Sequence, residues 1–205
     1  MGHFHESPQN DRIRGSPVHH RAARFAVMTH TSLHPDTQTR VTSQAEALAD
    51  RLEQGARALI AFATGLTDAE WEIRTPHDGR TVGVIVHHVA SVYPLEIQLA
   101  QTVAGGKPVT GVTMADVDAM NARHAADNAK VTRQAALELL RTNSAAAAAA
   151  IRALSDEQLA QAAPVSLYSD APLTCQFVLE DHAVRHSYHH LARIRAALGR
   201  QAVAA

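Results

Sequence analysis

Apolar residues recur at every third or fourth position over long stretches of this chain, which is the spacing of α-helices that bury one face. The first stretch runs from about Thr42 to Ala63, and Gly65 follows it as a C-terminal cap. Its apolar positions are Ala45, Leu48, Leu52, Ala56, Leu59 and Ile60. The pattern therefore predicts a first core helix over these residues.

A second stretch, from about Val82 to Val103, has a histidine in the middle of its apolar face. On a helical wheel of about 100° per residue, His88 lies at the centre of that face and His87 toward its flank. Its apolar companions are Val84, Ile85, Val92, Leu95, Leu99 and Val103. Such a histidine is more commonly a satisfied core residue than a ligand, but once buried it needs a bonding partner. Pro94 predicts a kink about one turn beyond it.

A third helical region runs from about Met114 to Leu154, and it could break near Lys130–Thr132. The Ala145–Ala150 run is a strong helix former that lets a neighbouring helix approach closely. The other apolar positions are Met114, Val117, Met120, Leu137, Leu140, Ile151 and Leu154. Asn121 and His124 lie on this region, where either could reach a site, although a solvent-facing role is the more common one.

Two short segments repeat one another. Leu154–Leu159 follows the pattern of Leu66–Trp71: each comes after a long helix, carries a capping box and precedes a proline-containing loop and a histidine-bearing helix. The chain thus consists of two helix–turn–loop–helix halves. Two such halves predict an all-α fold, an up-down four-helix bundle, in which the histidines of the second and fourth helices can face one another.

The fourth helical stretch, residues 172–199, carries four histidines. Residues four apart lie almost above one another on a helix, so His186 and His190 can aim two imidazoles at one point. The helical wheel places this pair at the edge of the buried face. It places His182 and His189 further toward solvent.

Composition narrows the class of protein. Aromatic residues make up only 4% of the 205 residues, and the formal net charge is −1, so no basic surplus exists to neutralise phosphates and a dedicated nucleic-acid binder is disfavoured. The sequence contains no run of 18 or more apolar residues, so we predict no membrane span. The single cysteine, Cys175, excludes an intramolecular disulfide and indicates a reducing, cytoplasmic compartment. At the start of an apolar helix it is more commonly a packing residue than a nucleophile.

Residues 1–40 lack a sustained apolar period and predict a disordered N-terminal extension, followed by one bundle domain over residues 41–200. Six of the fourteen histidines lie in this extension, and we discount them as ligands. Met28 is a hypothetical alternative start.

Three imidazoles remain as a metal-ligand set: His88, His186 and His190. Three neutral histidines suit Zn²⁺, Ni²⁺, Fe²⁺ or Mn²⁺ and leave coordination positions open for water or substrate. Bound water could serve as a nucleophile, or the metal could activate a substrate thiolate. Each ligand ring should also donate its second N–H to a partner, for which Glu96, Glu180 and Asp181 are candidates.

The histidine pattern resembles a known family. His182-Ala-Val-Arg-His186-Ser-Tyr-His189-His190-Leu-Ala-Arg is similar to the last-helix signature of the DinB/YfiT-like superfamily, and Thr81–Ala90 is similar to the second helix, with its single histidine. The resemblance covers residues 42–199 in the same helical order. It implies an up-down four-helix bundle, often a homodimer, with a three-histidine metal site at His88, His186 and His190. Arg193 departs from the Gln or His of many relatives.

The resemblance implies several activities, from thiol-dependent transferases and isomerases to metal-dependent hydrolases. The leading hypothesis is a metal-dependent enzyme acting on a small molecule, either a hydrolase or a transferase that uses a low-molecular-weight thiol. A second hypothesis is a non-catalytic metal-binding or stress-response module. A third, a helical DNA-associated factor, conflicts with the near-neutral charge.

Overall fold

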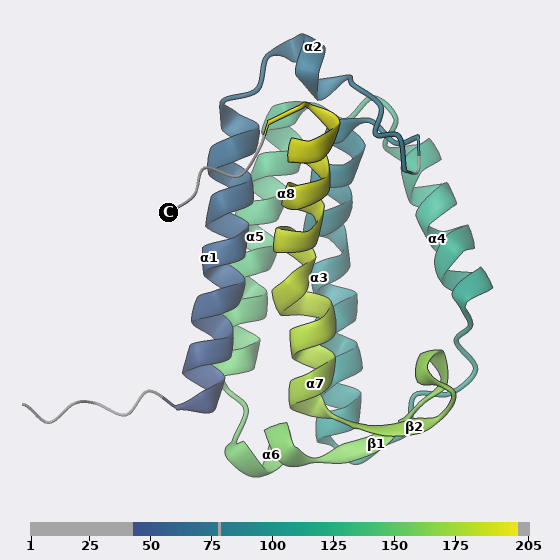
Figure 1. Cartoon of the computed structure of the whole chain (residues 1–205). Helices are drawn as coiled ribbons and strands as arrows, with labels where there is room; N and C mark the ends of the chain where they lie inside the picture. Colours follow the sequence, from purple (N-terminus) through teal and green to yellow (C-terminus); the bar gives the residue numbers. More distant parts are fainter. Residues whose placement is uncertain (1–42, 78, 201–205) are drawn as a thin grey trace, which may run out of the picture. The chain divides into compact units, whose positions relative to one another are not determined.

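The computed structural model describes residues 43–77 and 79–200. The extension expected over residues 1–40 and the alternative start at Met28 therefore lie outside the described residues. Most of the described chain is helical (Figure 1).

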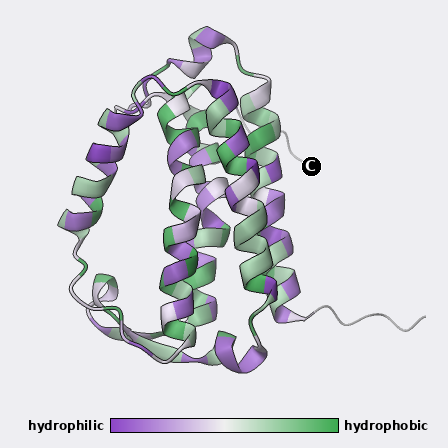
Figure 2. Cartoon of the chain, turned by 180° about the vertical axis from the view of Figure 1, so that it is seen from behind, coloured by the Kyte–Doolittle hydropathy of each residue, from purple (hydrophilic) through white to green (hydrophobic). Residues whose placement is uncertain are grey.

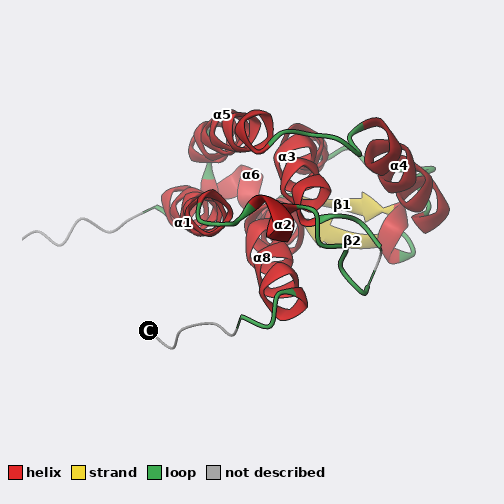
Figure 3. Ribbon diagram, turned by 90° about the horizontal axis from the view of Figure 1, so that it is seen from above, coloured by secondary structure: helices red, strands yellow, loops and turns green. Residues whose placement is uncertain are grey.

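Four long helical segments form the bundle, in agreement with the predicted all-α four-helix bundle. Seen from above, they stand around a common axis in the order α1, α5, α3 and α8 (Figure 3). α1 packs against α5 and α8, and α3 packs against α5 and the α7–α8 segment, which closes the ring. Their bounds are α1 Gln44–Thr64, α3 Val82–Ala104, α5 Arg133–Arg152, and a composite fourth segment of α7 Cys175–Leu179, η2 Glu180–Val184 and α8 Arg185–Ala197.

Capping residues mark where the helices begin and end. Thr81 begins α3 by accepting a hydrogen bond from the Val84 amide, and Gly65 caps α1 as the sequence predicts. The two repeated segments are short helices, α2 Asp68–Trp71 and α6 Asp156–Ala160, and both have complete capping boxes. Each half of the chain therefore contains the same feature, a short helix with a capping box after a long helix.

The third predicted region is broken. Its first part, α4 Met114–Asp127, ends before the predicted break, and it stands outside the bundle beside α3 (Figures 1 and 3). None of its residues is buried, so the apolar positions Met114, Val117 and Met120 do not belong to the bundle core, whereas Leu137, Leu140 and Ile151 of α5 do. Because α4 carries the chain back along the bundle, α3 and α5 run in the same direction.

A β-hairpin replaces the first turn of the predicted fourth helix. β1 Ala162–Val165 pairs antiparallel with β2 Ala171–Thr174, and Pro164 lies opposite Pro172. Proline lacks an amide donor, which a short two-stranded ribbon tolerates. η1 Ser166–Tyr168 lies between the strands. The loop after α3 is tied to the hairpin, since the Val109 amide donates to the Pro164 carbonyl at 2.9 Å.

α3 is the central helix, and it passes through Pro94 without ending. Proline cannot donate to the carbonyl of Ala90, and Asn143 of α5 donates to that oxygen instead, at 2.8 Å. By length and composition α3 could cross a membrane, but 67% of its most apolar window is buried inside the bundle. This burial accounts for its apolar composition. Hydrophobic positions of the helices can be followed in Figure 2.

Candidate metal centre

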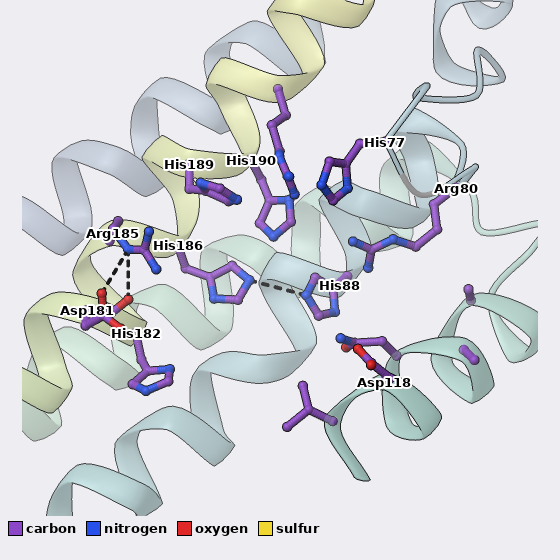
Figure 4. Close-up of a pocket in the computed structure, with 15 residues that line it drawn as sticks. His77, Arg80, His88, Asp118, Asp181, His182, Arg185, His186, His189 and His190 are labelled. Atoms are coloured by element: carbon purple, nitrogen blue, oxygen red, sulfur yellow. Dashed lines mark hydrogen bonds and ion pairs between the residues drawn. The ribbon is translucent and has the colours of Figure 1, made fainter. Parts of the chain in front are cut away.

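Three histidine rings from two helices meet beside α4. His88 comes from α3, and His186 and His190 come from successive turns of α8 (Figure 4). One ring nitrogen of each lies within 4.8 Å of those of the other two. His186 Nε2 is 3.3 Å from His88 Nε2, and the His186 and His190 ring centroids are 4.8 Å apart. These are the three residues that the helical wheels select, now placed close enough for one ion to contact all three.

The helix that carries the histidine pair is irregular just before it. Residues Glu180–Val184 form a π-helical turn, in which each amide reaches back five residues. The wheel assumes a constant rotation per residue and therefore misplaces what lies in that turn. His182 is half-buried and lines the cavity at the site, whereas the wheel places it toward solvent. His189 is exposed, as the wheel indicates.

Burial keeps His190 uncharged. His88 and His190 are only 5% and 6% exposed. Desolvation, reinforced by the neighbouring His186 and His88, holds the pKa of His190 far below its usual value. His190 is thus a neutral imidazole at physiological pH, the form in which histidine binds metals.

Glu96 orients one of the rings. Its Oε1 accepts a hydrogen bond from His186 Nδ1–H at 2.5 Å, which leaves His186 Nε2 to face His88. Glu96 lies two turns beyond His88 on α3 and is 6% exposed. It is the one of the three predicted carboxylate partners that contacts a ligand candidate. Glu180 instead pairs with Arg51, and Asp181 accepts from Tyr168 and pairs with Arg185.

The donor set suits a transition metal. It offers three ring nitrogens, one of them on a ring that a buried carboxylate orients, and this is the common arrangement of histidine metal sites. His190 Nδ1 is buried and has no hydrogen-bond partner among the described residues. A buried polar atom in that condition is unfavourable, and a bound ion or water at the ring would relieve it. The residues present therefore fit a divalent ion.

Two further histidines support the wall of the site. His87 Nδ1 lies 2.9 Å from His124 Nε2, and the two rings stack. His124 comes from α4 and is half-buried, so the expected solvent-facing role for it is wrong. Desolvation lowers the pKa of both rings. The pair joins α4 to α3 one residue from His88.

A polar cavity of about 570 Å³ opens onto the three rings. Besides His88, His186 and His190, its walls include Arg80, Arg185 and Arg193, with Asp118 from α4. Arg80 and His77 come from the loop before α3, and Figure 4 shows both directed toward the rings. The histidine signature singles out neither residue, because neither shares the periodicity of a helix.

Tyr168 is a further site residue that sequence reasoning misses. Its hydroxyl donates to Asp181 and lies 3.1 Å from His182 Nε2. Tyr168 lies in η1, inside the hairpin that the sequence pattern does not predict. Desolvation and the Asp181 carboxylate raise the pKa of this phenol, so it stays protonated. The expected packing role of Cys175 agrees with its complete burial, which raises the pKa of the thiol to about 11.

Comparison with known proteins identifies the family. The family model described as the DinB superfamily matches residues 51–194, most of the chain. The chain belongs to the DinB superfamily. This membership confirms the resemblance stated from the histidine pattern.

A solved structure shares the DinB-superfamily fold. It is described as "YfiT from Bacillus subtilis is a probable metal-dependent hydrolase with an unusual four-helix bundle topology". The match has a TM-score of 0.61 and 21% sequence identity, and it covers 77% of this chain and 89% of YfiT. At this identity the likeness establishes the fold alone. No curated protein sequence matches the chain.

Proposed function

We propose that this DinB-superfamily protein is a metal-dependent hydrolase of a small-molecule substrate, with His88, His186 and His190 as ligands of one divalent ion. The observation that carries the proposal is the convergence of three ring nitrogens within 4.8 Å at the wall of an open cavity. Three protein ligands leave coordination positions for water and substrate, which distinguishes a catalytic site from a closed structural one. The description of YfiT as a probable metal-dependent hydrolase supports the same reading.

The donor set accommodates Zn²⁺, Ni²⁺, Fe²⁺ or Mn²⁺. When bound, such an ion supplies Lewis-acid chemistry and lowers the pKa of a coordinated water toward neutrality. Glu96 holds the His186 ring in the orientation that presents Nε2. The carboxylate also makes that ring a more basic ligand.

His182 is the residue placed to move a proton. The Tyr168 hydroxyl donates its proton to Asp181, so the hydroxyl oxygen of Tyr168 accepts a hydrogen bond from His182 Nε2–H. His182 Nδ1 then keeps its lone pair. Desolvation lowers the pKa of His182, so the ring is neutral and ready to accept a proton at neutral pH. We assign it the role of general base for water, at the wall of the cavity.

The open coordination position would also suit the sulfur of a low-molecular-weight thiol, which is the transferase alternative. Cys175 cannot supply that sulfur, because it is fully buried in the core. A thiol would therefore have to enter as a second small molecule. This requirement separates the two reactions experimentally.

The test is an assay of purified protein stripped of metal and reloaded with each of the four ions, against a panel of esters, amides and phosphoesters. We expect hydrolysis that is lost on metal removal, restored by one or more ions, and unchanged by added thiols. His189→Ala, a histidine that lines the same cavity without belonging to the cluster, is the matched control for the metal content of His190→Ala. Turnover that survives metal removal would contradict the proposal, and turnover that requires a thiol would favour the transferase.

A further inference from the structure

A second cavity, of about 430 Å³, lies between α3, α4 and the hairpin. Its walls are mostly hydrocarbon side chains. α3 contributes Val92, Leu95 and Leu99, α4 contributes Val117 and Met120, and η1 contributes Leu167. We call it the apolar cavity. Its volume is in the usual range of small-molecule sites.

The apolar cavity adjoins the candidate metal centre. His88 and His186 line both the polar and the apolar cavity, and so do Val117, Asn121 and His182. Two of the three ligand candidates therefore form the boundary between the cavities. A molecule that reacts beside these rings would therefore have one end in the polar cavity and the other end in the apolar cavity.

Two acidic residues belong to the walls of the apolar cavity, and both are held by neighbouring groups. Glu96 Oε1 accepts from His186, and Asp116 accepts from the amide and hydroxyl of Thr113 in the capping box of α4. Glu96 Oε2 is buried without a hydrogen-bond partner among the described residues, and it lies on the side of the cavity next to the histidine rings. The polar cavity on the other side of His88 is different, since three arginines line it.

We propose that the apolar cavity binds a hydrocarbon group of the substrate, so that the substrate is an amphiphile whose reacting polar group lies beside His88 and His186. This inference rests on the proposed function and adds the substrate class to it. Burying hydrocarbon next to the reacting group is favourable because it removes apolar surface from water. The occupant is a small molecule because the metal-ligand candidates themselves form part of the wall.

The rim of the cavity offers residues that can be changed without disturbing the core. Leu95 and Met114 are 48% and 58% exposed, although both belong to the wall. Leu95→Lys places a charge at the rim. Leu99→Trp fills part of the space from a half-buried position that also packs against the core. Gln98→Lys is the matched control, because Gln98 is exposed on the same helix and lines neither cavity.

The experiment measures binding of n-alkyl hydroxamates, from two to ten carbons, to the metal-loaded protein by calorimetry. Each buried methylene should tighten binding by up to about fourfold until the cavity is full. Leu95→Lys and Leu99→Trp should flatten this dependence on chain length, and Gln98→Lys should preserve it. A parallel series of n-alkanols on metal-free protein reports on the cavity without any metal or turnover.

Affinities that do not change with chain length in either series would overturn the inference. So would a dependence on chain length that both cavity variants retain. If Leu95→Lys splits a dimer, seen by light scattering, while the chain-length dependence stays intact, the apolar wall is a contact between copies and the inference fails. Absence of hydrolysis together with chain-length-dependent binding would refute the proposed function alone.

Discussion

At the scale of single residues, the site depends on which nitrogen each ring presents. The carboxylate of Glu96 decides this for His186, because it accepts only from Nδ1–H. Helical periodicity suffices to select His88, His186 and His190, since each lies on or beside an apolar face. It cannot select Glu96 over Glu180 or Asp181. That choice depends on how α3 and α8 are placed against one another, and spacing along one helix does not contain it.

Replacing Glu96 by Ala should weaken metal binding about 10- to 100-fold, because the His186 ring loses its orienting partner. Glu96→Gln should lose less metal affinity, since an amide oxygen still accepts a hydrogen bond from His186 Nδ1–H. Competition with a chromophoric chelator measures the affinity. Glu180→Gln is the control, because Glu180 pairs with Arg51 away from the rings. Equal affinities for Glu96→Ala and Glu180→Gln would show that the hydrogen bond to His186 has no role.

Replacing His182 by Ala should lower kcat about 10²- to 10⁴-fold, the usual contribution of a general base, and leave metal content unchanged. Tyr168→Phe should have a smaller effect, because it removes only the group that orients His182. Steady-state kinetics and metal analysis on the same preparations separate the two roles. Loss of metal in His182→Ala would instead make His182 a ligand.

At the scale of elements, the close approach of α2 and α3 depends on a missing side chain. A Cβ on Gly83 would lie 2.3 Å from Trp71 Nε1 and 2.4 Å from Cε2. The Trp71 ring is 5% exposed, and its Nε1–H donates to the Val131 carbonyl at 3.2 Å. α2, α3 and the segment after α4 therefore meet at one indole.

We expect Gly83→Ala to destabilise the fold by about 1–3 kcal/mol, because the indole must move and lose its packing. Gly65→Ala is the control: its φ is −86°, and the nearest atom to a new Cβ is 3.7 Å away. Urea unfolding followed by tryptophan fluorescence compares the two. Equal urea midpoints for Gly83→Ala and Gly65→Ala would mean that the indole moves without loss of stability.

α1 and α5 are joined by an ion-pair cluster around Arg152. Its guanidinium contacts Glu46, Asp50 and Glu53 at 2.9, 2.7 and 2.8 Å. The hydrogen bond from Arg152 is the main reason that the pKa of Glu53 lies below its ordinary value of about 4.5. A carboxylate with a lowered pKa in the folded state stabilises the fold above pH 4.5, and this contribution is lost as the pH falls through the folded-state pKa.

Arg152→Met should therefore reduce stability at pH 7, and the difference from wild type should shrink as the pH drops below 4.5. Thermal unfolding between pH 7 and pH 3 measures how the stability of the wild type and of Arg152→Met depends on pH. Arg141→Met, an exposed arginine of the same helix with no ion pair among the described residues, is the control. A difference that stays constant down to pH 3 would contradict the assigned cause.

At the scale of the whole molecule, periodicity and capping residues predict the four bundle helices, and the bounds of α1 and α3 agree within two residues. The same signals do not predict that α4 leaves the bundle. Met114, Val117 and Met120 have helical spacing, and spacing does not tell a face that packs in a core from one that lines a cavity. The hairpin is missed because its strands have four residues each, too few for a clear alternation. Tyr168 is missed with it.

The central claim is that this DinB-superfamily protein holds one divalent ion through His88, His186 and His190. The most direct test is elemental analysis of the purified protein beside a His88→Ala, His186→Ala double variant, with circular dichroism to verify that both remain folded. The account predicts about one ion per chain in the wild type and in His189→Ala, and loss of the ion in the double variant. Equal metal content in the wild type and a folded double variant would contradict it.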